Sequence, residues 1–452
     1  MSYLRKPFIL ITSTAILLLL FDYCTAAEEQ KVVNSQSADY WNILEFGAKG
    51  DGKTDDTQAI QRTLNLARKY RATVYFPEGV YRINPDKPLI VRSNVSIIGS
   101  GSESVLRADH RKFGWELVRL SGDRITVSNM TLDGNLAVNR VLVVGSNSSN
   151  VLIEGVEIAN AAQSSDPKND YHSQVVSGLY IYGNTSNIQF DRSEIRHIKA
   201  QYGLPVARGI YVTTSWHSVE KAPFRVSITN SRFHDVGPAD DGDCIYVEDR
   251  NKENRNSDVS LMESVIAHNE FSACAKRAIK IFADGVEVTD NRIVNTFSSN
   301  NKYVSLSQQD VRVPDMYAGI SAYGNEITIE DNTLYGVGSY YAAVEVGAAL
   351  PVSGITVANN KIRMGRNSDI EGTTGIRLGN VTDFAIEGNL INHGAKAIWI
   401  WEDAHDGSIT DNVISMPVGG GVDLSGLEQS MDENGITVDG NRIDAKTFKI
   451  KH

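Results

Sequence analysis

The chain of 452 residues has few cysteines, few prolines and no surplus of positive charge. It contains 3 Cys and 11 Pro, and its 44 Lys and Arg face 55 Asp and Glu, which gives a formal net charge of −11. We therefore expect no nucleic-acid partner, because nucleic-acid binding depends on cations that contact phosphates. Three cysteines also exclude a disulfide-rich scaffold. An anionic partner would require a local basic patch or a bridging metal ion.

Residues 1–27 have the composition of a signal peptide. Arg5 and Lys6 precede an apolar stretch at 8–21, and small residues at 25–27 offer a cleavage site. The stretch is short for a membrane span, which needs about 20 residues. We expect a secreted or periplasmic protein with no stable membrane insertion after cleavage; the alternative is a membrane anchor. Cys244 and Cys274 then remain, either as one disulfide or as two buried thiols.

A repeat of the form apolar-x-apolar-x-x-Asn-x-apolar extends through most of the chain, for example at 286–293 and 327–334. The Asn position recurs every 22 to 41 residues, and it is occupied by Met130, Val156, Ser193, Ser231, Asn269, Asn291, Asn332, Asn360, Asn389, Asn412 and Asn441. Repeats of this length with alternating β-rich segments predict a solenoid of stacked coils. The pattern predicts an all-β, single-stranded parallel β-helix of about eleven or twelve coils, whose Asn side chains stack along one turn.

The N-terminal part combines a glycine- and aspartate-rich segment, an amphipathic helix to about Tyr70 and a β-rich segment at 74–83. Asp55 and Gln58 suit a capped helix start, and the helix would cover the open end of the solenoid. This combination resembles the N-terminal signature of the pectate-lyase superfamily of right-handed parallel β-helices. Polysaccharide lyases, polygalacturonase-like hydrolases, uronan epimerases and phage tailspikes share that signature. The resulting division is a lead segment at 28–42, the cap and first coils at 43–106, and β-helix repeats at 107–452.

A second strand in each coil has a small residue before its inward aliphatic residue, as in 178–182 and 244–248. Alternation of side chains along a strand predicts two outward columns. The first column contains Tyr180, Tyr211, Tyr246, Lys280, Ser321, Glu345, Arg377, Trp399 and Asp423, and the second contains Tyr182, Thr213, Glu248, Phe282, Tyr323, Gly347, Gly379, Trp401 and Ser425. Aromatic rings with interspersed charges suit sugar binding. The alternative is a face covered by loops or by another subunit.

Four long intervals between repeats predict loops at 163–177, 214–224, 249–258 and 298–317 that form walls around the central coils. There, the segment 240–245 resembles part of the polygalacturonase pattern, although the flanking motifs of that family are absent. Asp241 and Asp243 could act as a hydrolytic carboxyl pair. They suit turn formation or a calcium site equally well, so calcium is a possible cofactor and no metal ligand is assigned.

β-Elimination from a uronate requires a group that neutralises the carboxylate, a base and an acid. Arg208 and Arg277 suit the carboxylate clamp, Lys280 suits the base, and Tyr246 suits the acid or base. The catalytic set is Lys280, Tyr246, Arg277, Asp241 and Asp243. The substrate-binding set is Arg208, Tyr211, Glu248, Tyr180, Phe282, Tyr323, Arg377 and Trp399. In the structural alternative, Lys280 and Arg277 only pair with Glu248 and Asp243 across neighbouring coils.

These residues favour an exported, monomeric enzyme that acts on an acidic, uronate-containing polysaccharide as a lyase. The alternatives are a glycoside hydrolase that uses Asp241 and Asp243, a uronan C5-epimerase, and a non-catalytic carbohydrate-binding or tailspike-like β-helix. An epimerase would use the same clamp and base without losing the leaving group.

Overall fold

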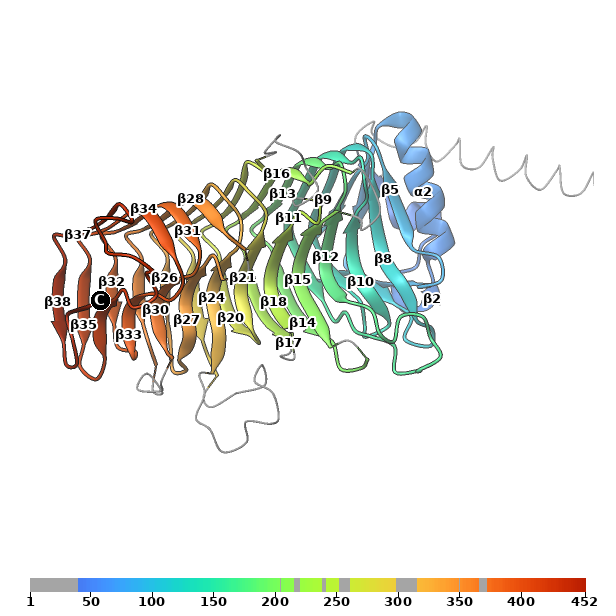
Figure 1. The fold of residues 1–452 in the computed structure, drawn as a ribbon. Helices are drawn as coiled ribbons and strands as arrows, with labels where there is room; N and C mark the ends of the chain where they lie inside the picture. The colour runs from blue at the N-terminus through green and yellow to red at the C-terminus, as the bar shows by residue number, and fades with distance from the viewer. Residues whose placement is uncertain are drawn as a thin grey trace, which may run out of the picture.

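The computed structural model describes residues 40–203, 205–214, 220–237, 241–251, 261–297, 315–348, 350–365 and 372–452. The predicted signal peptide, most of the lead segment, Asp240, most of the predicted wall loops 249–258 and 298–317, and residues 215–219 of the loop 214–224 lie outside these ranges. The chain forms an elongated stack of coils, with blue N-terminal elements at one end and red C-terminal elements at the other (Figure 1). This arrangement is the predicted parallel β-helix.

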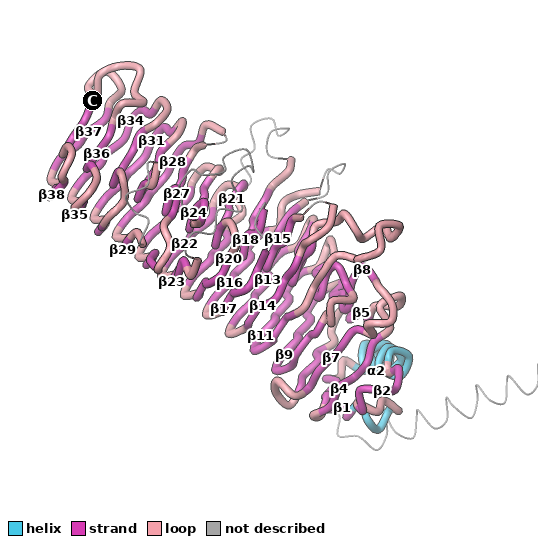
Figure 2. Tube along the Cα trace, turned by 90° about the horizontal axis from the view of Figure 1, so that it is seen from below, coloured by secondary structure: helices cyan, strands magenta, loops and turns pink. Residues whose placement is uncertain are grey.

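One face of the stack is a parallel sheet that has thirteen strands among the described residues. Each coil contributes one strand to it, as the parallel rows in Figure 2 show. In order along the stack, the strands are β5 (Leu89–Arg92), β8 (Gly114–Ser121), β10 (Val138–Val144), β12 (Val176–Tyr182), β15 (Val206–Thr213), β18 (Asp241–Glu248), β21 (Arg277–Phe282), β24 (Met316–Ala322), β27 (Tyr340–Val346), β30 (Thr374–Leu378), β33 (Lys396–Ile400), β36 (Gly420–Asp423) and β39 (Ile450–Lys451). The stack is slightly longer than predicted because its end coils carry no copy of the Asn motif.

The other strands form a second parallel sheet, in which each coil contributes one or two segments separated by a turn. Its N-terminal strands are β1 (Tyr40–Asn42), β2 (Asp51–Asp55), β3 (Thr73–Phe76), β4 (Gly79–Ile83), β6 (Ser96–Gly99), β7 (Ser104–Ala108), β9 (Asp123–Asp133), β11 (Ser149–Ala159), β13 (Ser186–Asp191), β14 (Glu194–Lys199), β16 (Phe224–Thr229), β17 (Arg232–Gly237), β19 (Ser264–Ala267) and β20 (Glu270–Cys274). Its C-terminal strands are β22 (Val286–Thr289), β23 (Arg292–Asn295), β25 (Ile327–Glu330), β26 (Thr333–Gly336), β28 (Val352–Ala358), β29 (Lys361–Arg363), β31 (Val381–Glu387), β32 (Leu390–Asn392), β34 (Ala404–Thr410), β35 (Val413–Met416), β37 (Ile436–Asp439) and β38 (Arg442–Ala445).

The Asn ladder explains the turns of the second sheet. The Asn291 amide oxygen accepts a hydrogen bond from the backbone N–H of Asn269 at 3.0 Å, and Asn332 does the same for Asn291 at 2.9 Å. The ladder continues to Asn441. Ser193 and Ser231 extend it toward the N-terminus, because each hydroxyl accepts from the preceding rung at 3.0 Å. The predicted stacking of Asn side chains is confirmed, and the serines fulfil the same acceptor role.

The helix α2 (Thr57–Tyr70) covers the N-terminal end of the stack (Figure 1), after the short 3-10 helix η1 (Ile43–Phe46). Ile60, Leu64 and Ala67 are buried against the first coils, as the amphipathic pattern predicted. Asp55 caps the helix start as predicted, because its carboxylate accepts from the backbone N–H of Thr57 at 3.1 Å. Asp56, the residue directly before the helix, instead accepts from the backbone of Lys49 and Gly50 at 2.7 and 3.1 Å.

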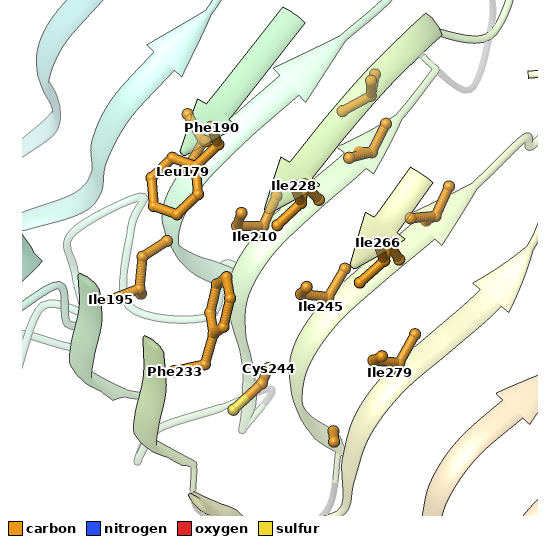
Figure 3. Packing of buried hydrophobic residues seen from close by; sticks show 14 of the residues in the cluster. Leu179, Phe190, Ile195, Ile210, Ile228, Phe233, Cys244, Ile245, Ile266 and Ile279 are labelled. Carbon is orange, nitrogen blue, oxygen red and sulfur yellow. The ribbon is translucent and has the colours of Figure 1, made fainter. Parts of the chain in front are cut away.

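The interior is continuous, and in the thirteen-stranded sheet two successive residues of each coil face it. Figure 3 shows Leu179, Ile210, Ile245 and Ile279 beside one another, together with Cys244 from the small-residue position. A Cβ at Gly319 would lie 2.4 Å from Leu334, so the core leaves room only for a small residue there. The Cys244 thiol uses this inward position to form a disulfide with Cys274. Of the two states that the sequence left open, the disulfide is correct.

Candidate active site

The residues of the first predicted outward column lie side by side on neighbouring strands, as predicted. Cα pairing links Tyr180, Tyr211, Tyr246 and Lys280 across β12, β15, β18 and β21. It then continues through Ser321, Glu345, Arg377, Trp399 and Asp423. The structure has a third outward column that the sequence did not predict. Simple alternation would turn the small residue before each inward aliphatic residue outward, but in the structure this small residue also faces inward. The residue before it therefore faces outward, and Arg208, Asp243 and Arg277 lie in register with one another.

Two carboxylates and two guanidinium groups form the centre of this face. Arg208 contacts the Asp241 carboxylate and lies 2.8 Å from Asp243. Arg277 Nη1 lies 3.3 Å from Asp241 and 3.4 Å from Asp243. Asp243 is fully buried, and both arginines are at least nine-tenths buried. The arginines predicted as a free clamp are thus occupied, as the structural alternative expected for Arg277 and Asp243.

Two lysines border this centre and are more exposed than the arginines. Lys276 Nζ lies 3.8 Å and Lys280 Nζ 4.0 Å from Asp241. Burial and then the neighbouring arginines lower the pKa of both lysines, although the aspartates partly oppose this effect. Burial would raise the pKa of Asp241, but Arg208 and Lys280 outweigh it and hold that pKa below its ordinary value. The centre contains four cations and two carboxylates, so it carries an excess of positive charge within an acidic protein.

A tyrosine pair stands next to the lysine. The Tyr211 and Tyr246 rings stack with centroids 5.4 Å apart, and the Lys280 ammonium lies 4.5 Å from the Tyr246 centroid. Both hydroxyls donate to Glu248, at 2.6 and 3.0 Å, and Arg250 donates to the same carboxylate at 2.8 Å. Burial and the Glu248 charge raise the pKa of both tyrosines. At neutral pH they are therefore proton donors rather than bases.

A second carboxylate of the same kind lies along the face. Glu345 is fully buried and accepts from Tyr317 at 2.8 Å and from Tyr323, while Arg377 pairs with it at 3.3 Å. Burial and then Glu345 raise the pKa of both tyrosines. The sequence named Tyr323 and Arg377 as binding residues but gave Glu345 no partners, because Tyr317 falls in a segment predicted as a loop.

Other predicted binding residues lie further out on the same face. Tyr180 packs under the Arg140 guanidinium at 3.6 Å, and Phe282 contacts the Tyr323 ring at 6.5 Å. Trp399 lies beside Arg377 at 5.5 Å. Tyr171, from the one predicted wall loop that is described in full, packs on Trp115 with ring centroids 5.2 Å apart, so that loop borders the N-terminal part of the face.

Within the part of the chain that the structure describes, no group of three or more His, Cys, Asp or Glu side chains is arranged to hold a metal ion. The calcium site considered for Asp241 and Asp243 is instead filled by the arginines and lysines. None of the described helices is long and apolar enough to cross a membrane.

Comparison with known families agrees with this architecture. Residues 40–214 match the family described as rhamnogalacturonase A/epimerase, pectate lyase-like, and residues 299–449 match the right-handed β-helix region. These matches and the fold confirm the resemblance of the chain to the pectate-lyase-like right-handed parallel β-helix proteins, as its N-terminal segment and repeats predicted.

Curated relatives share only a short segment with it. The chain is 40% identical over 111 residues to alginate lyase 7 of Azotobacter vinelandii, a match that covers 21% of this chain and 13% of the lyase. It is 39% identical over 113 residues to mannuronan C5-epimerase AlgE2 of the same organism, which covers 21% of this chain and 11% of the epimerase. The chain thus matches a small part of the length of these relatives.

Solved structures show the same fold over most of the chain. The surface adhesin PfbA of Streptococcus pneumoniae superposes with a TM-score of 0.65 at 18% identity, covering 85% of this chain and 90% of the adhesin. The catalytic unit of a GH87 α-1,3-glucanase from Streptomyces thermodiastaticus gives a TM-score of 0.57 at 16% identity, covering 92% of this chain and 70% of the glucanase. At these identities the likeness concerns the fold alone.

Proposed function

We propose that this protein is an exported enzyme that binds an acidic, uronate-containing polysaccharide on the thirteen-stranded face and cleaves it by β-elimination. The observation that supports this function best is the positively charged centre, in which Lys280 contacts the Tyr246 ring. Its excess cations attract a polyanion, and the excess is local, since the chain as a whole is acidic. The similarity of a short segment to an alginate lyase and mannuronan epimerases supports the same substrate class. The disulfide fits an oxidising compartment and supports export.

The roles follow from exposure and charge. Arg208 and Arg277 are buried and paired, so they hold Asp241 and Asp243 and lower the pKa of the lysines. Lys276 is placed to neutralise the uronate carboxylate, which acidifies the proton at C5. Lys280, whose pKa is lowered, takes that proton as the base.

The electron pair of the C5–H bond then forms the C4–C5 double bond, and the bond from C4 to the glycosidic oxygen breaks. Tyr246 donates its hydroxyl proton to the departing oxygen, because its raised pKa keeps it protonated until that step. A proton from solvent restores Tyr246, and Lys280 releases the proton that it gained. In the structure this proton is donated to Glu248 at 3.0 Å, so the hydroxyl turns from Glu248 to the glycosidic oxygen for the transfer, and Glu248 holds the phenol in place until then.

A C5-epimerase is the second candidate, since proton removal by Lys280 is common to both reactions and the short segment is about equally similar to epimerases. The two reactions differ only after that step, because the lyase breaks the bond at C4 whereas the epimerase returns a proton to the opposite side of C5. The hydrolase is the weaker alternative, because Asp243 is fully buried between two arginines and is not placed to meet a substrate.

The test is incubation with alginate, pectate, glycosaminoglycans and bacterial exopolysaccharides, with calcium and with chelator. Elimination produces a conjugated double bond, so ultraviolet absorbance should rise with the wild type and stay flat with Lys280→Ala. New reducing ends without absorbance, abolished by Asp241→Asn, would establish hydrolysis instead. Exchange of the C5 proton without cleavage would establish the epimerase. Activity that persists in Lys280→Ala would overturn the assignment of the base.

A further inference from the structure

An aromatic cluster surrounds Arg377 on the same face, toward the C-terminal end of the stack. The guanidinium carbon lies 4.0 Å from the Trp401 ring centroid, 4.8 Å from Tyr341 and 5.5 Å from Trp399. Arg377 itself is 6% exposed, whereas the three rings are partly exposed. An arginine therefore fixes three aromatic side chains that would otherwise rotate freely at the surface.

The cluster differs from the lysine centre in its charge. Arg377 is neutralised by Glu345 at 3.3 Å. Lys396, whose ammonium covers Trp399 at 3.3 Å from the ring centroid, pairs with Asp423 at 2.9 Å, and Lys451 lies 3.5 Å from the same carboxylate. A ligand would thus meet aromatic surface with most of the charge compensated, which favours contact with the C–H face of a sugar ring.

Trp401 has unused hydrogen-bond donors beside it. In its own column the two preceding coils carry Gly347 and Gly379, so the side chain that stands next to the indole on that side is Arg377 of the neighbouring column. Among the described residues, the indole N–H groups of Trp399 and Trp401 and the Nε–H of Arg377 have no hydrogen-bond partner. Buried donors without a partner are costly, and sugar oxygens can accept from them after a small side-chain shift.

We infer that this cluster is a second sugar-binding subsite, which holds a pyranoside unit of the polysaccharide by stacking on Trp401. The inference rests on the proposed function, because it extends the same polymer along the same face. Lys280 on β21 and Trp399 on β33 are four coils apart, roughly 19 Å at the strand spacing. A polymer can occupy both places, whereas a trisaccharide at the lysine centre cannot reach Trp401.

Isothermal titration calorimetry with alginate and polygalacturonate, as trisaccharides and as long oligomers, tests this in the Lys280→Ala background. Trp401→Ala should weaken long-oligomer binding about tenfold and leave trisaccharide binding unchanged. The lost affinity should not depend on salt, since stacking is not screened, whereas Lys276→Ala should lose affinity most at low salt.

Tyr335→Ala is the matched control, because this aromatic residue also carries an arginine, Arg292, over its ring but lies on the other sheet. Trp401→Phe guards against misfolding and should retain part of the affinity. Unchanged long-oligomer binding in Trp401→Ala would overturn the subsite while leaving the proposed function intact. Failure of both saccharides to bind any variant, with no cleavage by the wild type, would overturn both.

Discussion

Tyr211 and Tyr246 stack almost parallel, with an interplanar angle of 6°, and both hydroxyls donate to the one carboxylate of Glu248. The stacked arrangement uses one face of each ring, and only 4% and 7% of the two residues is exposed. The tyrosines therefore do not form the open platform that an outward aromatic column suggests. Their hydroxyls are held together at Glu248, and the Lys280 ammonium lies over the Tyr246 ring.

The first prediction separates the two tyrosines. Tyr246→Phe removes the proposed acid and should lower kcat on the order of 100- to 10,000-fold, with KM little changed. Tyr211→Phe removes a second hydrogen bond to Glu248 and the one that the Tyr211 hydroxyl accepts from Arg250, but no proposed acid, so its kcat should fall far less. Steady-state kinetics of both variants on the substrate found by absorbance would check this. Equal losses would show that Tyr246 has no special role in proton transfer.

The second prediction concerns the pH dependence of the reaction. Lys280 acts as a base only when neutral, and its pKa lies below the ordinary value of about 10.4. The reaction rate should therefore rise with pH and level off at a pH below that value. Lys280→Arg should abolish the rise together with the activity, because arginine stays protonated. A rate that is independent of pH across the neutral and alkaline range would contradict the lysine base.

The third prediction concerns acid stability. Asp241 has a folded-state pKa below its unfolded value of about 3.9, so its ionised form stabilises the fold above that pH. This contribution should disappear as the pH falls through the folded-state pKa. In denaturant titrations, Asp241→Asn should lower the free energy of unfolding at neutral pH and show little further effect in strong acid. The same loss at both pH values would mean that the charge of Asp241 is not responsible.

The fourth prediction concerns the disulfide. Cys244 and Cys274 are 30 residues apart in the sequence, and closing a loop of this size stabilises a fold by about 3–4 kcal/mol in the chain-entropy description. The double variant Cys244→Ala/Cys274→Ala should lose stability of this order while keeping its β-rich circular dichroism spectrum. A reducing agent should destabilise the wild type and leave the double variant unaffected. An unchanged denaturation midpoint would contradict a stabilising role.

The fifth prediction concerns the Asn ladder. Asn332 is fully buried and accepts from both the backbone and the side chain of Asn291. Asn332→Ala leaves these donors unsatisfied and should cost about 1–3 kcal/mol for each. Asn65→Ala, on the exposed side of α2, is the control and should change the stability by less than about 0.5 kcal/mol. Chemical denaturation of the two variants would show the difference.

The sequence alone determined the fold. The Asn repeat has a fixed internal spacing, and each Asn bonds its counterpart one coil away, so a local motif specified most of the stack. It also determined the outward column from Tyr180 to Asp423, because side-chain alternation within each strand is a local property of the backbone.

Only the tertiary structure decided how the site residues are paired. The position before each aliphatic faces the core, where a larger side chain would collide with neighbouring strands, and the residue before it therefore points outward, which brings Arg208, Asp243 and Arg277 into one cluster. An arginine can bind a substrate carboxylate only if no carboxylate of the protein already neutralises it. Asp243 neutralises Arg208 and Arg277 from one coil away, at a distance in sequence that no local pattern encodes. For the same reason Glu345 acquired its tyrosine and arginine partners only when the coils stacked.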